Sequence, residues 1–352
     1  MPSLKSKKFI IQYKLLRWFK KNQRILPWRT SANNNLPNPY YVMVSEFMLQ
    51  QTTVNSVISK FNEFIQIWPN LKKLSAVNEN EILQFWSGLG YYIRAKNLFK
   101  STKIITEKYN SIIPDNYHEL IKLPGVGDYT AKAILGIGFN QSVMPVDANI
   151  ERILARLYGL KKPIILIKKN ISSLAESYIS KKQSSNLIQA FMDYGSIICM
   201  PRNPKCNVCE IAKECVAYKK NLIHIIPKKK KSTNTKIKKY TRAYIIINHS
   251  NEILVRRRSP KGMLPSMVEI PNDKWVTRKK LLKKDNAANF FKNKLNHRGS
   301  LLYSFSHFDL EVDIFLIKSS KKKIKNHKWI LLNNISSSGM PTIMKKIVAK
   351  VK

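Results

Sequence analysis

The chain has 352 residues, enough for two domains, and 44% of them are hydrophobic, which excludes a disordered chain. Its 63 basic and 21 acidic side chains give a formal net charge of +42, which favours a polyanionic partner such as nucleic acid. The Lys-, Asn- and Ile-rich composition also fits the codon bias of an AT-rich genome. The charge alone therefore does not decide between a nucleic-acid partner and codon bias.

The N-terminus shows neither a membrane span nor a signal peptide. Membrane helices need about 18 consecutive apolar residues, and no stretch approaches that length. The apolar residues at 9–19 are interrupted by Gln12, Lys14 and Arg17, and no small-residue cleavage site follows. We therefore expect a cytoplasmic protein with no membrane partner.

Residues 1–225 are predicted to be all-α. Apolar side chains recur at helical spacing in two clear stretches, 54–65 and 150–160. Helix-breaking pairs such as Asn38–Pro39 and Trp68–Pro69 separate the helical stretches.

Two carboxylates stand out in this region because acids are scarce. Glu46 lies within Val44-Ser-Glu-Phe-Met-Leu-Gln-Gln-Thr52, and Asp147 lies just before a predicted helix. A pair of carboxyl groups can perform acid–base chemistry when their pKa values are pushed apart. Taken singly, Glu46 also fits a solvated helix position and Asp147 a helix N-cap.

The segment Leu123-Pro-Gly-Val-Gly127 lies between two helical stretches. Its glycines permit a tight turn whose amide groups, at Gly125, Val126 and Gly127, stand beside a helix N-terminus and form an anion site. The segment resembles a helix-hairpin-helix motif near residues 118–140, which binds DNA phosphate without reading sequence. A plain turn is the alternative.

All four cysteines fall within residues 199–215, with the spacing Cys199-x6-Cys206-x2-Cys209-x5-Cys215. Clustered thiols in a cytoplasmic chain favour metal ligation over disulfides. Zinc and an iron–sulfur cluster both accept four thiolates, but zinc sites generally pair two short Cys knuckles, and this spacing has one. Arg202 and Lys205 in this loop are candidates for a DNA phosphate contact, with ordinary surface charge as the alternative.

Beyond residue 225 the composition changes. Residues 226–241 are lysine-rich with no apolar period and are predicted to be a linker. Residues 242–352 show a mixed α/β pattern, with strands expected at 243–247, 253–255 and 308–314 and a closing helix at 343–351.

Taken together, these motifs resemble the MutY family of adenine DNA glycosylases, in the endonuclease III/helix-hairpin-helix superfamily. The likeness is close over residues 10–220 and weak beyond. It implies an α+β multidomain protein: an all-α glycosylase domain with a [4Fe-4S] loop, followed by a smaller MutT-like (Nudix-like) domain. The motifs that carry it occur in family order: Leu26-Pro-Trp-Arg29, Ser45 to Thr52, Gly88-Leu-Gly-Tyr-Tyr92, the hairpin, Val146-Asp-Ala-Asn149 and the four cysteines.

The resemblance implies a role for each residue around the glycosidic bond. Glu46 would protonate adenine N7 and later help to activate water, and Asp147 would stabilise the sugar cation. Asn149 and Tyr129 would assist at the sugar. Where endonuclease III-like enzymes have a Schiff-base lysine, this chain has Tyr129, so we expect base removal without efficient strand cleavage. Lys132, one helical turn away, leaves weak lyase activity open.

The resemblance also implies how the duplex is opened and read, because the target base must leave the stack. Gln51 and Tyr91 would wedge into the duplex near 8-oxoguanine. The adenine pocket would be lined by Trp28, Arg29 and Gln189. Residues 31–38 lengthen the loop after Arg29 relative to many relatives.

In the C-terminal domain, Phe305-Ser306-His307 matches a family motif that reads the oxidised base, with Ser306 and His307 as its contacts. The acidic Nudix signature is absent, so this domain should bind and not hydrolyse. Residues 261–271 lack the family's usual Trp or second Gly, which predicts weaker discrimination of 8-oxoguanine from guanine.

The hypothesis is therefore a monomeric bacterial base-excision enzyme of the nucleoid that removes adenine opposite 8-oxoguanine or guanine in double-stranded DNA. Two alternatives remain: an endonuclease III-like glycosylase/lyase for oxidised pyrimidines, and a non-catalytic DNA-binding protein decayed from such an enzyme. Tyr129 and the C-terminal domain argue against the first, and retention of Glu46, Asp147 and all four cysteines argues against the second.

Overall fold

The computed structural model describes residues 4–29, 36–179, 182–228, 236–259, 262–265, 267–290, 295–320, 323–335 and 338–351. The chain's own contacts divide it into two compact units, Met1–Ala76 with Asn97–Lys231, and Val77–Lys96 with Ser232–Lys352. The segment 77–96 therefore packs with the C-terminal part, which a single boundary at residue 225 does not anticipate. Across the described ranges, no helix combines the length and apolar character that a membrane crossing requires.

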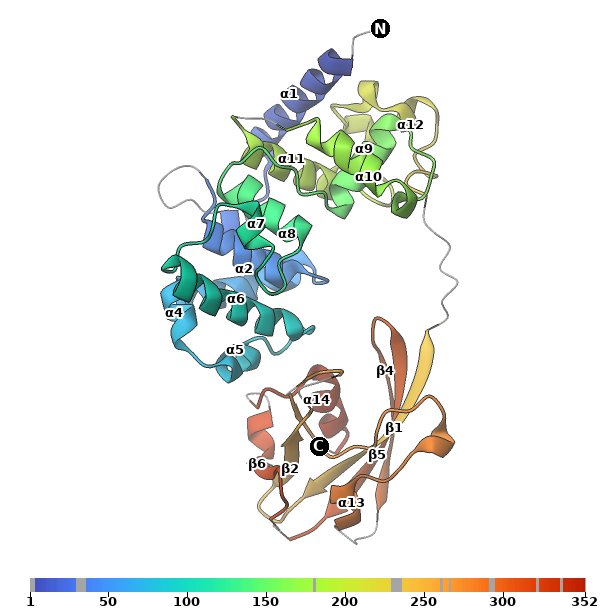
Figure 1. Cartoon of the computed structure of the whole chain (residues 1–352). Helices are drawn as coiled ribbons and strands as arrows, with labels where there is room; N and C mark the ends of the chain where they lie inside the picture. The colour runs from blue at the N-terminus through green and yellow to red at the C-terminus, as the bar shows by residue number, and fades with distance from the viewer. Residues whose placement is uncertain are drawn as a thin grey trace. The chain divides into compact units, whose positions relative to one another are not determined.

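The first unit is helical, as the sequence predicts (Figure 1). Helix α6 (Ile93–Tyr109) begins in the second unit and ends in the first. Short turns of 3-10 helix lie at η1 (Pro27–Arg29), η3 (Ile164–Leu166), η4 (Cys206–Val208) and η5 (Ala212–Glu214), and a π-helical turn, η2, at Ile134–Gly138. The other α-helices are α1 (Leu4–Asn22), α2 (Pro39–Leu49), α3 (Val54–Ile67), α4 (Leu71–Ala76), α7 (Tyr117–Leu120), α8 (Asp128–Ala133), α9 (Ala148–Tyr158), α10 (Lys168–Glu176), α11 (Ser184–Ile197) and α12 (Val216–Lys219).

Local sequence explains where the two site-bearing helices begin. The Asn38 side chain accepts a hydrogen bond from the Tyr40 amide at 2.9 Å, and Pro39 occupies the first turn, so α2 starts there. Asp147 caps α9 by accepting from the Ile150 amide at 2.7 Å. Helix α9 ends at Gly159, whose φ of 65° is the left-handed conformation that favours glycine. Helix α9 is thereby fixed at the end that carries Asp147, whereas Glu46 lies near the far end of α2.

The second unit is built on a six-stranded sheet of order β3-β2-β1-β5-β4, with β6 also pairing with β2. Strands β1 and β5 run parallel, and the other pairs are antiparallel. The α-helices and strands of this unit are α5 (Glu79–Phe85), β1 (Ile237–Ile247), β2 (Glu252–Arg257), β3 (Val268–Glu269), α13 (Asn286–Phe290), β4 (Asn296–Ser304), β5 (Phe308–Lys318), β6 (His327–Leu331) and α14 (Thr342–Val348).

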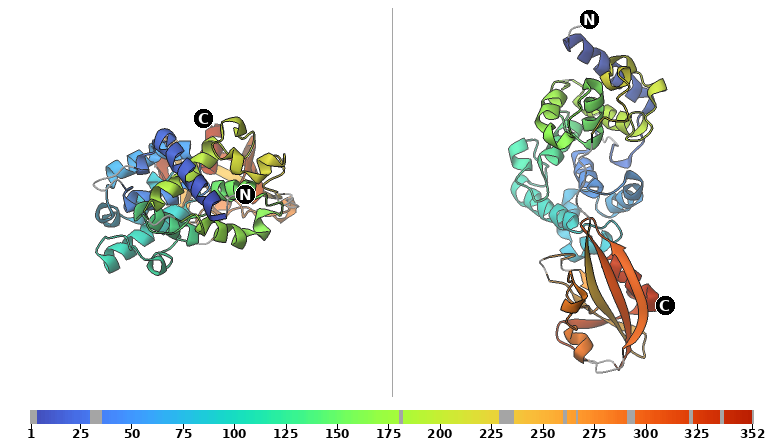
Figure 2. Two further views of the ribbon diagram at one scale, coloured as in Figure 1. Left: turned by 90° about the horizontal axis from the view of Figure 1, so that it is seen from above. Right: turned by 90° about the vertical axis from the view of Figure 1, so that its right-hand side faces the viewer.

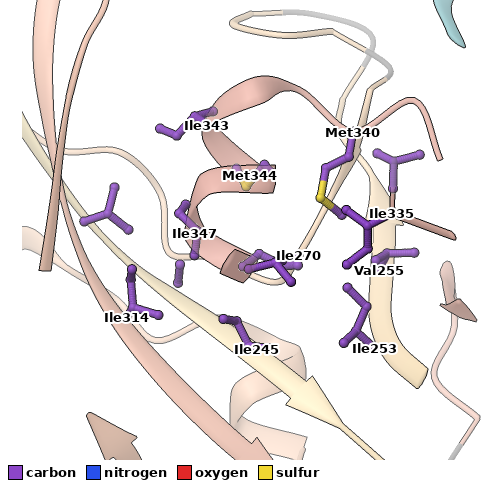
Figure 3. Close-up of a cluster of buried hydrophobic side chains, with 14 of the residues drawn as sticks. Ile245, Ile253, Val255, Ile270, Ile314, Ile335, Met340, Ile343, Met344 and Ile347 are labelled. Carbon is purple, nitrogen blue, oxygen red and sulfur yellow. The ribbon is translucent and has the colours of Figure 1, made fainter. Parts of the chain in front are cut away.

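Helices cover both faces of this sheet because successive strand residues point to opposite sides. In β1, Ala243 and Ile245 join the core under α14, whereas Tyr244 and Ile246 join a second core that includes Ala288 of α13. Figures 1 and 2 show α14 on its face of the sheet. Figure 3 shows Ile347 of α14 close to Ile245 and Ile314.

The predicted linker at 226–241 is too long at both ends. Ile226 is buried, and its carbonyl accepts a hydrogen bond from Arg156 Nε at 2.9 Å, so it still belongs to the helical unit. Strand β1 begins at Ile237, and Lys238 and Lys239 already pair with Asp309 and Leu310 of β5. The sequence analysis assigned the start of this strand to the linker because of its lysines. Exposed residues near the start of a strand need not be apolar.

Candidate active site

A cavity of about 570 Å³ opens in the helical unit. Its size suits a nucleobase with part of its sugar. The predicted catalytic and adenine-pocket residues all line it: Glu46, Tyr129, Asp147, Asn149, Trp28, Arg29 and Gln189. Helices α2, α8, α9 and α11, together with η1, therefore bring together residues that are far apart in the sequence.

Glu46 lies on α2, with 8% of the residue exposed. Burial, and after it the nearby Asp147 carboxylate, raise the pKa of its carboxyl to about 8 against the opposing effect of a hydrogen bond with Tyr129. At neutral pH this group is therefore mainly a neutral acid that can donate a proton.

Asp147 is the N-cap of α9, and its carboxylate accepts several hydrogen bonds. Burial raises the pKa of its carboxyl, but hydrogen bonds from the Ile150 amide and from Asn149 oppose that rise. The Asn149 amide donates to Asp147 Oδ2 at 2.7 Å, and Arg152 Nη2 donates to Asn149 Oδ1 at 2.8 Å. These donors favour an anion at Asp147, which gives the two carboxyl groups different environments.

Tyr129, on α8, contacts this pair. Burial raises the pKa of its phenol well above the ordinary value, and the two neighbouring carboxyl groups, Glu46 and Asp147, raise it further. Lys132 is ion-paired with Asp128 at 3.2 Å and lies 3.8 Å from Glu176. It is not among the residues that line the cavity.

Two of the adenine-pocket residues are fixed by neighbours. Trp28 is buried and packs edge-on against Phe61, with ring centroids 5.4 Å apart, so it serves both the core and the cavity wall. The Gln189 amide nitrogen donates to the carbonyl and hydroxyl oxygens of Ser185, both at 3.1 Å. Its carbonyl oxygen is then the group suited to accept a hydrogen bond from a ligand.

Two residues of this region escaped the sequence analysis. Arg24 also lines the cavity, and Asp193 of α11 is fully buried behind it. Arg29 donates to both carboxylate oxygens of Asp193, at 2.7 and 2.8 Å. The sequence did contain a signal for Asp193, because it is the only charged residue in the helix Ser184–Ile197.

The hairpin takes the conformation that its glycines predict. Gly125 has a φ of 79°, and an added Cβ would lie 2.7 Å from Asn97 Cβ. Gly127 is the N-cap of α8. The Val126 side chain is buried and its amide donates to the Leu123 carbonyl at 3.1 Å, so Val126 shapes the turn, and its contact with a phosphate stays a prediction.

The cysteine loop folds around a pocket that all four cysteines line. Arg156 Nη1 lies 3.3 Å from Cys199 Sγ, and the Tyr194 hydroxyl lies 3.3 Å from Cys209 Sγ, so donors point at two of the sulfurs. Among the residues that the structure describes, no group of three or more His, Cys, Asp or Glu side chains could hold a metal ion. Arg202 and Lys205 are exposed beside this loop.

The residues predicted to probe the duplex lie outside the cavity. Gln51 is exposed at the end of α2, and its neighbour Gln50 lines the cavity instead. In the second unit, Ser306 and His307 are exposed in the turn between β4 and β5, and the Ser306 hydroxyl hydrogen bonds with the Tyr91 hydroxyl. Gln51 and Tyr91 have positive φ angles of 58° and 46°, which are uncommon for such residues.

Two expectations fall where the structure gives no description. Residues 31–35 of the lengthened loop, and Lys261 and Ser266 of the altered segment, lie outside the described residues.

Comparisons with known proteins identify two domains. Residues 44–179 match the family model described as HhH-GPD superfamily base excision DNA repair protein, and residues 242–350 match the NUDIX domain model. Among solved structures, a thermostable thymine-DNA glycosylase is 26% identical with a TM-score of 0.55, covering 61% of this chain and 98% of that chain. The predicted fold class is thereby confirmed.

Full-length relatives match nearly the whole chain. A protein named adenine DNA glycosylase from Buchnera aphidicola subsp. Baizongia pistaciae is 36% identical over 357 residues, covering 96% of this chain and 95% of the relative. Its namesake from Buchnera aphidicola subsp. Acyrthosiphon pisum is also 36% identical, with 98% of each chain covered.

Proposed function

The chain belongs to the adenine DNA glycosylase (MutY) family, as the sequence predicts, and on that premise we propose that it removes adenine opposite 8-oxoguanine or guanine by acid-assisted hydrolysis. The observation that carries the proposal is the shared cavity in which Glu46, with a pKa of about 8, faces the donor-stabilised Asp147.

Glu46 acts as the general acid in this proposal. Adenine is a poor leaving group until its ring is protonated, and a neutral carboxyl of Glu46 supplies that proton at N7. The vacated carboxylate then accepts a proton from the attacking water. Burial of Glu46 is what keeps the proton available at neutral pH.

Asp147 acts beneath the sugar. Departure of the base leaves positive charge on the deoxyribose, and an anionic Asp147 stabilises that charge. Asn149 holds the carboxylate in place through its 2.7 Å hydrogen bond, and Tyr129 bridges to Glu46. The acid and the anion thereby act on opposite ends of the same glycosidic bond.

Recognition of the extruded adenine falls to the walls of the cavity. The Gln189 carbonyl oxygen accepts from the adenine 6-amino group, because its amide nitrogen is engaged by Ser185. Trp28 supplies a flat apolar surface that is fixed by Phe61. Arg29 donates to the edge of the base.

Strand cleavage is not part of this activity. A phenol at position 129 cannot form the imine that a lyase needs. Lys132 is held by Asp128 and Glu176 and lies outside the cavity lining, which supports the same conclusion.

The cysteine pocket fits an iron–sulfur cluster better than zinc. The four thiols line one pocket, and their spacing has a single short Cys knuckle where zinc sites generally pair two. Cys199, Cys206, Cys209 and Cys215 would hold a [4Fe-4S] cluster, which would stabilise the loop that carries Arg202 and Lys205. Iron and sulfide analysis of the purified protein tests this assignment.

One set of residues binds the DNA backbone, and another contacts the bases at the lesion. The amides of Gly125 and Gly127, with Arg202 and Lys205, bind phosphate. Gln51 and Tyr91 fill the space left by the extruded base, while Ser306 and His307 read 8-oxoguanine. The Tyr91–Ser306 hydrogen bond supports a joint role at the lesion. We expect a monomer that acts on chromosomal DNA in the bacterial nucleoid.

A single-turnover assay tests the proposal with a duplex that contains one adenine opposite 8-oxoguanine. Base loss is detected as strand breaks after alkali. Wild type and Glu63→Gln, an exposed carboxyl paired with Lys60 outside the cavity lining, should both release adenine. Glu46→Gln should be slower by about 100-fold or more. Equal rates for Glu46→Gln and wild type would overturn the mechanism, and borohydride trapping of wild type on DNA would favour a lyase.

A further inference from the structure

Asp193 holds both arginines of the cavity wall. None of its surface is exposed, and its carboxylate accepts four hydrogen bonds. Two come from Arg24, through its amide at 2.9 Å and Nε at 2.6 Å, and two from Arg29, through Nη1 at 2.7 Å and Nη2 at 2.8 Å. The Arg29 pair is bidentate, which fixes the plane of that guanidinium.

The cavity wall therefore carries two permanent positive charges. Arg24 and Arg29 line the same cavity as Glu46 and Asp147, and their side chains are only 25% and 11% exposed. Solvent screens charges this deep in the protein only in part.

These two cations oppose the chemistry that the proposed function requires. Protonation of the base and loss of the sugar bond both build positive charge in the cavity. Guanidinium groups in the wall repel that charge unless an anion offsets them. Asp193 is the carboxylate that contacts both arginines.

We propose that Asp193 is a positioning residue that fixes Arg24 and Arg29 against the adenine and offsets their charge, so that the cavity tolerates a cationic transition state. This inference rests on the proposed function. Burial alone would raise the pKa of Asp193, but the hydrogen bonds and charges of Arg29 and Arg24 hold it below the ordinary value, so the carboxylate is ionised.

The experiment compares affinity for two abasic-site analogues placed opposite 8-oxoguanine in duplex DNA. One is a pyrrolidine, which is cationic at neutral pH and mimics the charged sugar, and the other is a neutral tetrahydrofuran of similar shape. The ratio of the two dissociation constants measures how strongly the cavity prefers the cationic analogue over the neutral one. A purely structural role would weaken both complexes alike and leave that ratio unchanged.

Two variants should move the ratio in opposite directions. Asp193→Asn keeps the shape and removes the anion, so the preference for the cationic analogue should fall about tenfold or more. Arg29→Gln leaves Asp193 ionised beside Arg24, so the preference should rise. Glu63→Gln, outside the cavity lining, should match wild type.

The outcomes separate this inference from the function on which it rests. If wild type neither releases adenine nor prefers the cationic analogue, the proposed function fails. If wild type does both and Asp193→Asn or Arg29→Gln keeps the wild-type ratio, Asp193 has no electrostatic role. Should Asp193→Asn not fold, the rise expected for Arg29→Gln still decides the matter.

Discussion

The pH dependence of adenine release follows from the protonation of Glu46. The acid must be neutral to donate its proton, and its pKa is about 8. The single-turnover rate should therefore be near its maximum at pH 7 and about tenfold lower at pH 9. Below neutrality the rate should fall once Asp147 becomes protonated, because burial raises the pKa of that carboxyl as well.

The same group links pH to folding stability. A carboxyl whose folded pKa is raised from 4.5 to about 8 binds more protons in the folded than in the unfolded state across that window. Stability is therefore lost as pH rises through it, by on the order of 5 kcal/mol once pH exceeds 8. Glu46→Gln cannot ionise, so its free energy of unfolding should lack this loss.

Two assays check these expectations over pH 5–10: single-turnover base release, and chemical denaturation of wild type beside Glu46→Gln. DNA affinity of Glu46→Gln over the same range controls for effects on the duplex. A flat rate between pH 7 and 9, or parallel stability curves for the two proteins, would refute the assignment of a raised pKa to Glu46.

Three further predictions concern the rest of the molecule. Ser306→Ala removes the hydroxyl proposed to read the lesion, so the preference for adenine opposite 8-oxoguanine over guanine should fall about tenfold. Unchanged relative rates would exclude that contact. Replacing both Arg202 and Lys205 with Ala should lower the slope of log affinity against log salt by about two, as measured by fluorescence anisotropy. An unaltered slope would remove both from the interface. Gly125→Ala forces a Cβ to 2.7 Å from Asn97 at a φ of 79°, so denaturation should show a loss of about 1–3 kcal/mol. Wild-type stability would show that the hairpin can relax.

Sequence patterns predicted much of the fold because they report on local physics. The strict alternation at 308–314 predicted part of β5, and the helical period at 150–160 predicted α9, which Asp147 caps. The lysines at 236–239 concealed the start of β1, since that strand is identified by its pairing partner β5 and not by its own composition.

The site residues that belong to a sequence motif were predicted. Those that only tertiary packing brings to the site were missed. Glu46 and Asp147 belong to recognisable segments, and the structure places both in one cavity. Arg24 and Asp193 escaped because their pairing spans 169 residues of sequence. The hydrogen bond of the Val126 amide within its own turn was likewise not predicted, because no sequence pattern shows whether a hairpin amide faces solvent or its own turn.

The central claim is that Glu46 is a neutral acid at neutral pH while Asp147 is an anion. Carbon-13 NMR of protein labelled at the glutamate and aspartate carboxyl carbons, assigned with Glu46→Gln and Asp147→Asn, measures both states directly. The account predicts that the Glu46 resonance titrates near pH 8 and that Asp147, which accepts hydrogen bonds from Asn149 and the Ile150 amide, ionises at lower pH than Glu46. Titration of Glu46 near its ordinary pKa of 4.5 would contradict it.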